Sequence, residues 1–219
     1  MGKIRKVSLK VMKERDFKHL PDMSDDWKNT FGEIPNSFIM LAFGDSGNGK
    51  SSFIMQIIRE IMHLGTILYV ALEEGISATV QRNINRAFAE DEYYTNIRFT
   101  DHTSNYETLF DYLKGRNRER FIIIDSLQYW DIDYRKYKRL KEAFPRKSFI
   151  FISHAEGKRP SGKTGINIYY DATVKVFVSH YVAHIISRGG RISNYVIWEA
   201  GALQHFGKKE LNKLIKAKN

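Results

Sequence analysis

Cysteine is absent from this chain of 219 residues, and its absence excludes a disulfide scaffold and any cysteine-ligated zinc site. Long apolar runs are absent too. The longest, such as Phe38 to Phe43, have the length of a strand and fall far below the roughly 20 residues that span a bilayer. The N-terminus is basic but lacks the apolar run of a signal peptide. We therefore expect a cytoplasmic protein with no membrane partner.

Acidic residues are in the minority. The chain has 35 Lys plus Arg against 25 Asp plus Glu, which gives a formal net charge of +10. This balance favours an anionic partner, with nucleic acid ahead of anionic membrane, although a basic protein can also carry such charge with no such partner. Hydrophobic residues at 42% and charged residues at 27% are ordinary for a folded protein. We expect a basic arm over residues 1–20, one folded core over 21–207 and a basic, helical tail over 208–219.

Apolar runs of strand length alternate with stretches of helical spacing through the first two thirds of the core. The predicted strands are residues 38–43, 66–72, 97–100, 121–125 and 148–153, and the predicted helices begin near residues 53, 77, 106 and 134. Strands separated by helices indicate right-handed crossovers. The fold class is therefore α/β, with a mostly parallel, twisted sheet and helices on both faces.

The last third of the core has a different pattern. Three strand-like runs over residues 172–179, 181–187 and 193–199 are joined by short connections. The connection Arg188-Gly189-Gly190-Arg191 is typical of a tight turn. We expect an antiparallel hairpin extension at this end of the sheet.

The strongest motif lies between the first predicted strand and the helix after it, and it matches the pattern G-x-x-x-x-G-K-[ST] in full. Backbone N–H groups of such a loop and the N-terminus of the helix surround the phosphates of a nucleotide. Lys50 is expected to reach the β- and γ-phosphates, and the Ser51 hydroxyl to bind Mg²⁺. The expected phosphate-binding residues are Gly44, Asp45, Ser46, Gly47, Asn48, Gly49, Lys50, Ser51 and Ser52. The motif predicts a site for a nucleoside triphosphate, ATP with Mg²⁺.

Acidic residues stand at the ends of two other predicted strands. Glu73 and Glu74 follow the second strand, where parallel strands present their carboxyl ends to a ligand. Glu73 is the candidate general base for a water molecule, with Glu74 as the alternate; the pair can also be a favourable acidic start to a helix. Asp125 ends four apolar residues, the form of a Walker B strand. We expect Asp125 to hold Mg²⁺ opposite Ser51.

Two further segments carry candidate contacts to nucleic acid. Aromatic and basic residues are interleaved after Asp125, and the candidates there are Tyr129, Trp130, Arg135 and Lys136. Stacking on bases and burial, either at a subunit contact or under a helix, are both open for these aromatics. The stretch of residues 155–165 is basic and rich in glycine, without periodicity, and we expect it to be a mobile loop. Its candidates are Lys158, Arg159 and Lys163, which suit contacts with a phosphodiester chain.

His154 ends the strand before this basic stretch. It is a candidate sensor of the γ-phosphate, although a histidine at a strand end is also commonly structural.

Taken together, these motifs resemble the RecA-superfamily ATPases, in particular the RadA (Sms) branch and the motor domain of DnaB-type replicative helicases. Four blocks carry the resemblance: residues 44–51; residues 67–74 with Arg82 beyond them; residues 122–126; and residues 154–157 running on to 171–173. The resemblance implies a RecA-like fold and makes Glu73 the catalytic base. It also places Arg82 near the nucleotide base.

The resemblance further implies a ring or filament of identical subunits that binds single-stranded DNA. In that family, basic residues of one subunit's hairpin reach the γ-phosphate of its neighbour, and Arg188 and Arg191 correspond to them here. The implied function is a DNA-stimulated ATPase in recombination, repair or replication. An ATP-gated oligomeric scaffold similar to the KaiC-like proteins, without DNA motor activity, is the alternative. A small P-loop kinase fits less well, because no arginine-rich lid follows Asp125.

Overall fold

The structure is a computed structural model, and it describes residues 6–21, 23–89, 94–101, 105–116, 118–188 and 193–216. Within these residues the strands are β1 (Ile39–Phe43), β2 (Thr66–Ala71), β3 (Ile97–Thr100), β4 (Glu119–Asp125), β5 (Ser148–Ser153), β6 (Ala155–Glu156), β7 (Arg159–Pro160), β8 (Val174–Ser179), β9 (Val182–Ser187) and β10 (Tyr195–Val196). The α-helices are α1 (Leu9–Lys13), α2 (Asp25–Phe31), α3 (Lys50–Ile61), α4 (Ala78–Ala87), α5 (Tyr106–Lys114), α6 (Tyr134–Ala143), α7 (Gly162–Asp171) and α8 (Glu199–Lys216). Two short 3₁₀ turns are η1 (Met62–Leu64) and η2 (Leu127–Tyr129).

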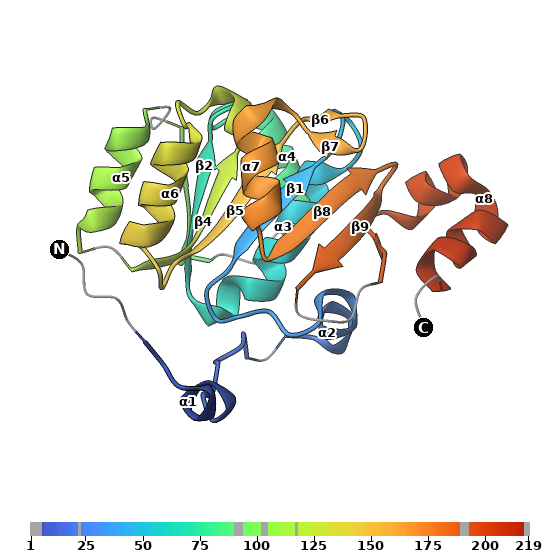
Figure 1. Cartoon of the computed structure of the whole chain (residues 1–219). Coiled ribbons are helices and arrows are strands. Elements are labelled where there is room, and N and C mark those ends of the chain that lie inside the picture. Colours follow the sequence, from blue (N-terminus) through green and yellow to red (C-terminus); the bar gives the residue numbers. More distant parts are fainter. Residues whose placement is uncertain are drawn as a thin grey trace.

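Eight of the strands form one sheet in the order β10-β9-β8-β1-β5-β4-β2-β3 (Figure 1). The strands from β8 through β1, β5, β4 and β2 to β3 are parallel neighbours, whereas β9 pairs antiparallel with β8 and with β10. β1 is central, and its residues are buried along its whole length. The polar segments that follow the parallel strands therefore all leave the sheet at its carboxyl edge.

Both faces of the sheet are covered by helices. Successive side chains of a strand point to opposite faces, so the apolar strands bury side chains on both sides of the sheet. Met40 and Ala42 of β1 lie in the apolar cluster beneath α2 and α3. Ile39, Leu41 and Phe43 lie in the cluster beneath α5, α6 and α7. Figure 1 shows α5, α6 and α7 over one face, with α3 and α4 over the other. This burial on both faces explains why the sequence of β1 is continuously apolar.

The segment that precedes β1 is attached to the body through α2. The indole of Trp27 is stacked on Phe31, with ring centroids 5.0 Å apart, and on Tyr195 of β10 at 4.8 Å. Leu20 is buried beside this helix, and its N–H donates to the carbonyl of Ile34. In contrast, the short helix α1 has no buried residue, and it lies away from the sheet in Figure 1.

The alternation of strands and helices predicted for residues 38–153 is confirmed, and so is the antiparallel extension at the end of the sheet. The third and fifth strands have the predicted bounds of residues 97–100 and 148–153, and α6 begins at the predicted residue 134. The turn predicted at residues 188–191 lies outside the described residues after Arg188. None of the helices in the described part of the chain has the length and apolar composition required to cross a membrane.

The prediction of a mobile loop over residues 155–165 is wrong. Residues 155–160 form the small hairpin β6–β7, and α7 begins at Gly162. The Ser161 N–H donates to the His154 carbonyl, and the Thr164 hydroxyl donates to the Ile132 carbonyl. Glycine lowers the intrinsic helix propensity of the first turn of α7, so packing against neighbouring segments decides its conformation.

Two elements near the C-terminus also differ from expectation. The third strand of the extension is only Tyr195–Val196, which is shorter than the predicted residues 193–199. The last helix begins at Glu199 rather than at Lys208, and it is interrupted at Gly207, which has φ 69° and ψ 160°. A left-handed glycine usually marks a helix end, which explains why the sequence pattern predicts only the second half.

Replacing Trp27 by alanine is expected to lower the free energy of unfolding by about 3–5 kcal/mol, because it empties the buried space between α2 and β10. Urea unfolding followed by far-UV circular dichroism measures the change. Tyr170→Ala is the matched control, since Tyr170 is 63% exposed. That control is expected to shift stability by less than about 0.5 kcal/mol. Equal stabilities for both variants would contradict the attachment of α2 described above.

Candidate active site

The loop of residues 44–49 connects β1 to α3, and its shape depends on two glycines. A Cβ on Gly44 would lie 2.1 Å from the carbonyl oxygen of Val178, so only glycine allows the loop to pass this close to β8. Gly49 has φ +98°, and a Cβ there would also lie 2.9 Å from the ring of Tyr181. L-residues rarely adopt this conformation. The helix α3 begins at the next residue, Lys50, so its N-terminal N–H groups face the loop.

Lys50 lies within this loop rather than in solvent. Its Nζ donates to the carbonyl oxygens of Gly44 at 2.8 Å and Asp45 at 2.9 Å. Burial has the largest effect on the pKa of Lys50 and lowers it, while the carboxylates of Glu73, Asp125 and Asp45 raise it. The ammonium group is therefore held among backbone carbonyls and acidic groups at the carboxyl edge of the sheet.

A cavity of about 230 Å³ opens beside the loop. Groups from the loop and from α3, α4, β2 and β4 line it, together with Tyr181. The lining residues are Ser46, Gly47, Gly49, Lys50, Ser51, Ser52, Tyr69, Ala71, Glu73, Glu74, Thr79, Val80, Asn83, Arg86, Asp125 and Tyr181. The motif residues Lys50 and Ser51 and the strand-end carboxylates Glu73 and Asp125 thus share one cavity, as their spacing in the sequence predicts.

Glu73 is held by three groups from neighbouring strands. Its N–H donates to the carbonyl of Asp125 at 3.0 Å, and the Ser126 hydroxyl donates to its Oε2 at 2.9 Å. The Nε2 atom of His154 lies 3.1 Å from both carboxylate oxygens. The Glu73 side chain remains 30% exposed, so its carboxylate is oriented and still reachable by water. This arrangement suits a general base.

Asp125 is half-buried and less exposed than Glu73, and one hydroxyl donates to its carboxylate. The Tyr69 hydroxyl, from the neighbouring strand β2, donates to Asp125 Oδ2. Burial raises the pKa of Asp125 to about 6; Glu73 and Glu74 reinforce this effect, and Tyr69 and Lys50 oppose it. Burial and Asp125 likewise raise the pKa of Tyr69 well above its usual value.

The oxygen donors in the cavity are of the kind that Mg²⁺ prefers. Ser51 contributes a hydroxyl from the first turn of α3, and Asp125 contributes a carboxylate from β4. Mg²⁺ is normally held by one or two such groups together with substrate phosphates and water. Among the described residues, three or more His, Asp or Glu side chains do not converge to form a complete metal site of their own. The donor set therefore fits a metal that arrives with a phosphate ligand.

The turn between β8 and β9 is hydrogen-bonded to the phosphate loop. Asn48 accepts from the N–H of His180 through its side chain at 2.8 Å, and from the N–H of Tyr181 through its carbonyl at 3.1 Å. His180 and Tyr181 have positive φ angles of 48° and 61°. Asn48 thus faces this turn and is not among the residues that line the cavity.

Arg82 does not line the cavity, contrary to expectation. The arginine of α4 that does so is Arg86, one helical turn further on, and Asn83 accompanies it. Arg82 and Arg86 are both exposed and lie one turn apart on α4, and of the two Arg86 lines the cavity.

Trp130 is buried with an exposed fraction of 4%, so it does not present a stacking surface for a base. Its ring packs against Tyr106 and Phe151 in the core. Of the two interpretations left open by the sequence, burial under a helix is therefore correct for Trp130. Tyr129 is different, because its ring is half exposed and lies edge-on to His154.

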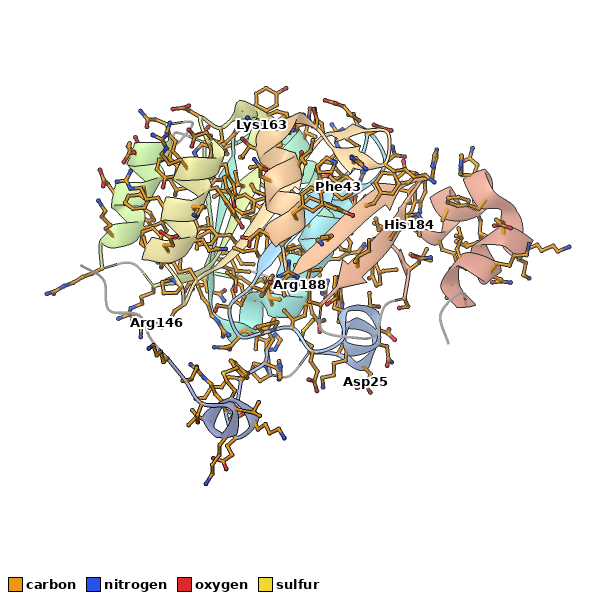
Figure 2. The ribbon with its side chains drawn as sticks, in the orientation of Figure 1. Asp25, Phe43, Arg146, Lys163, His184 and Arg188 are labelled. Carbon is orange, nitrogen blue, oxygen red and sulfur yellow. The ribbon has the colours of Figure 1, made fainter. Side chains whose placement is uncertain are left out.

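The basic candidates for nucleic-acid contact lie on segments that follow β4 and β5. Arg135, Lys158, Arg159 and Lys163 are exposed, whereas Lys136 is paired with Asp131 at 2.6 Å. Lys163 stands at the start of α7 in Figure 2. The contact between Thr164 and the Ile132 carbonyl brings the two segments together.

Arg188 lies at the opposite edge of the sheet from the loop of its own chain. Its N–H donates to the carbonyl of Thr173, which precedes β8, and its guanidinium donates to the Tyr170 carbonyl at 2.8 Å. Figure 2 shows Arg188 at this end of the sheet. Arg191, its expected partner, lies outside the described residues.

The sequence motifs do not identify several residues of the site. Tyr69 is hidden inside an apolar strand, and Ser126 follows Asp125 without a pattern of its own. Tyr181 reaches the loop from more than a hundred residues away. The sequence does not separate Arg86 from Arg82, because they lie one turn apart on the same helix.

A buried parallel strand, a glycine loop, a helix that begins at the lysine, and acidic groups at the ends of β2 and β4 define a P-loop nucleotide site on a RecA-like sheet. The chain has the RecA-like fold and resembles the RecA-superfamily P-loop ATPases.

Among known proteins, the chain is similar to DNA repair protein RadA of Streptococcus pyogenes serotype M6, with 29% identity over 97 residues. The match covers 44% of this chain and 20% of that protein. RadA of Streptococcus pneumoniae matches over the same length with 29% identity, which is 21% of its own length. The matched segment is thus about a fifth of these curated relatives. No protein-family model matches the chain.

Among solved structures, the flagellar accessory protein FlaH from Methanocaldococcus jannaschii superposes with a TM-score of 0.60 and 12% identity. The superposition covers 82% of this chain and 93% of FlaH. It shows that the shared fold extends beyond the segment that matches RadA.

Replacing Tyr69 by phenylalanine is expected to lower the free energy of unfolding by about 1–3 kcal/mol, because it leaves the half-buried Asp125 without its hydroxyl donor. Chemical unfolding at neutral pH measures the change. Tyr129→Phe is the control, because it removes a hydroxyl from a half-exposed ring. An unchanged stability in Tyr69→Phe, or an equal loss in the control, would show that the contact contributes nothing.

Proposed function

We propose that the protein is an ATPase that binds ATP with Mg²⁺ and hydrolyses it at the carboxyl edge of its sheet, and that single-stranded DNA stimulates this activity. The observation that carries the proposal is the single cavity shared by Lys50, Ser51, Glu73 and Asp125. A phosphate loop alone supports binding, whereas an oriented carboxylate beside it supports hydrolysis.

Each group has a distinct task in this proposal. The loop N–H groups and Lys50 hold the phosphates, and Ser51 and Asp125 hold the metal, which neutralises charge on the phosphate oxygens. Glu73 orients and deprotonates the attacking water. His154 bonds to both oxygens of Glu73 and connects the base to the segment after β5. A conformational change in that segment would therefore alter the position of the Glu73 carboxylate.

The DNA component rests on charge and position. The chain has a formal net charge of +10, and Arg135, Lys158, Arg159 and Lys163 are exposed. These residues lie on the segments that follow β4 and β5. Asp125 is the last residue of β4, and His154 is the first residue after β5. Exposed cations at such a position suit a sugar-phosphate backbone. The sequence similarity to a DNA repair protein, although limited to 97 residues, supports the same partner and a role in repair, recombination or replication.

Assembly is the third component. Arg188 lies at the edge of the sheet that faces away from its own phosphate loop, so it can act at such a site only in a neighbouring copy. An arginine supplied by another subunit stabilises charge in the transition state of phosphoryl transfer. We propose that the protein forms a ring or filament in which Arg188, with Arg191, completes the neighbouring site.

The wild-type protein is expected to hydrolyse ATP with Mg²⁺, and single-stranded DNA is expected to raise the rate. Glu73→Gln is expected to bind ATP but to lose about 10²–10⁴-fold in turnover, because the amide does not accept a proton from water. Lys50→Ala is expected to lose nucleotide binding. Phosphate release with and without DNA, together with equilibrium binding of ATP, measures these effects.

Variants that remove exposed cations at two different places test the DNA component. Lys158→Ala with Arg159→Ala is expected to reduce stimulation by DNA and leave the DNA-free rate unchanged. Lys114→Ala removes a cation that is paired with Asp111 on α5, and it is expected to leave stimulation intact. An ATPase rate that ignores nucleic acid would contradict the DNA component and favour an ATP-gated scaffold.

Arg188→Ala is expected to reduce turnover by about 10³-fold or more, with ATP binding retained. Mixing it with Lys50→Ala is expected to restore part of the activity, because some interfaces then combine an intact loop with an intact arginine. Mixing Lys50→Ala with Glu73→Gln is the control and is expected to remain inactive, since each cavity then has a defect. Full activity of Arg188→Ala, or no recovery in the first mixture, would exclude the role in the neighbouring site.

A further inference from the structure

A second and larger cavity, of about 710 Å³, adjoins the phosphate cavity. It lies between α3, α4 and the segment that leads from β10 to α8. Its lining residues are Ser52, Met55, Gln56, Arg59, Asn83, Arg86, Ala87, Tyr181, Ile197 and Trp198. Its volume is in the range of small-molecule sites.

The two cavities are neighbours, and their lining residues indicate how a nucleotide would be oriented across them. Ser52, Asn83, Arg86 and Tyr181 line both of them. The carboxylates of Glu73, Glu74 and Asp125 line only the smaller cavity. A triphosphate whose γ-phosphate lies beside these carboxylates therefore has its nucleoside end directed toward the larger cavity.

The wall of the larger cavity is aromatic and fixed. Trp198 is 52% exposed although it packs edge-on against Tyr181, with ring centroids 4.8 Å apart. The backbone beside it is held on both sides: the Gln56 amide donates to the Ile197 carbonyl at 3.0 Å, and the Ile197 N–H donates to the Tyr181 carbonyl at 2.8 Å. An exposed indole on a fixed backbone is a ready surface for stacking.

Some polar side chains of the larger cavity are hydrogen-bonded within the fold, and others are not. The Gln56 side chain is occupied, because it also accepts from the Tyr195 hydroxyl, and Arg59 donates to the Ala87 carbonyl. Among the described residues, the side chains of Asn83 and Arg86 make no such bond within the fold. An amide and a guanidinium are well suited to the ring nitrogens and exocyclic groups of a base.

We propose that the larger cavity is the nucleoside subsite of the ATP site, in which the purine packs against Trp198 and Tyr181 while Asn83 and Arg86 face its polar edge. This proposal rests on the proposed ATPase function. It assigns the recognition of the base to Asn83 and Arg86 of α4 rather than to Arg82, together with two aromatic rings from the C-terminal part of the chain. It also makes Trp198 a fluorescent reporter of occupancy, because the other tryptophans, Trp27 and Trp130, are buried.

Binding of ATP and of inorganic tripolyphosphate, each with Mg²⁺, tests the proposal, because the two ligands share their phosphates and differ in the nucleoside. Trp198→Ala is expected to weaken ATP binding about tenfold, which corresponds to 1.4 kcal/mol, and to change tripolyphosphate binding by less than about twofold. Trp198→Phe is expected to keep most of the affinity for ATP. Tyr170→Ala, which removes another exposed aromatic ring, is expected to change neither ligand.

The outcomes separate this proposal from the function on which it rests. Unchanged ATP binding in Trp198→Ala would overturn the subsite and leave the ATPase in place. An equal loss for both ligands would also overturn it, because the tryptophan would then support only the loop. Failure of the wild-type protein to bind either ligand would overturn the ATPase and the subsite together. Quenching of fluorescence by ATP in wild type but not in Trp198→Phe would support the stacking contact directly.

Discussion

The pairing of β1 with β5 on one side and β8 on the other is the constraint on which the whole site depends. In this register, Phe43 lies opposite Ser153 and Phe177, so three chain segments leave the sheet beside one another. They are the phosphate loop, the segment that begins with His154, and the turn between β8 and β9. Parallel pairing alone brings these segments to one edge, and the close approach of Gly44 to the Val178 carbonyl then sets how closely the loop follows β8.

The electrostatics of the site follow from the same arrangement. A half-buried lysine lies among three carboxylates, whose charges partly offset the effect of burial on the pKa of Lys50. The carboxylates nevertheless differ, because Asp125 is half-buried and bonded to Tyr69, whereas Glu73 is reachable by water and held by Ser126 and His154. Two acidic groups in different surroundings can take two different roles, one toward a metal and one toward water.

Much of this architecture could be predicted from the sequence because its signals are local. Phe38 to Phe43 is a strand because it is buried on both faces, and the helix after it begins where the loop motif places it. Glu73 and Asp125 could be assigned because parallel strands end at one edge. Long-range packing could not be predicted in the same way. The position of Arg86 rather than Arg82 beside the cavity, the burial of Trp130 and the first turn of α7 each depend on a neighbour that is distant in the sequence.

The contact between Asn48 and the β8–β9 turn has a consequence for folding. The two partners are separated by 132 residues, and the turn holds two non-glycine residues in the left-handed region, a conformation that costs roughly 1–2 kcal/mol for each. Bringing such distant segments together costs loop-closure entropy, and contacts of long range slow folding. The observed shape of the eight-residue loop motif therefore depends on a turn that lies more than a hundred residues further along the chain.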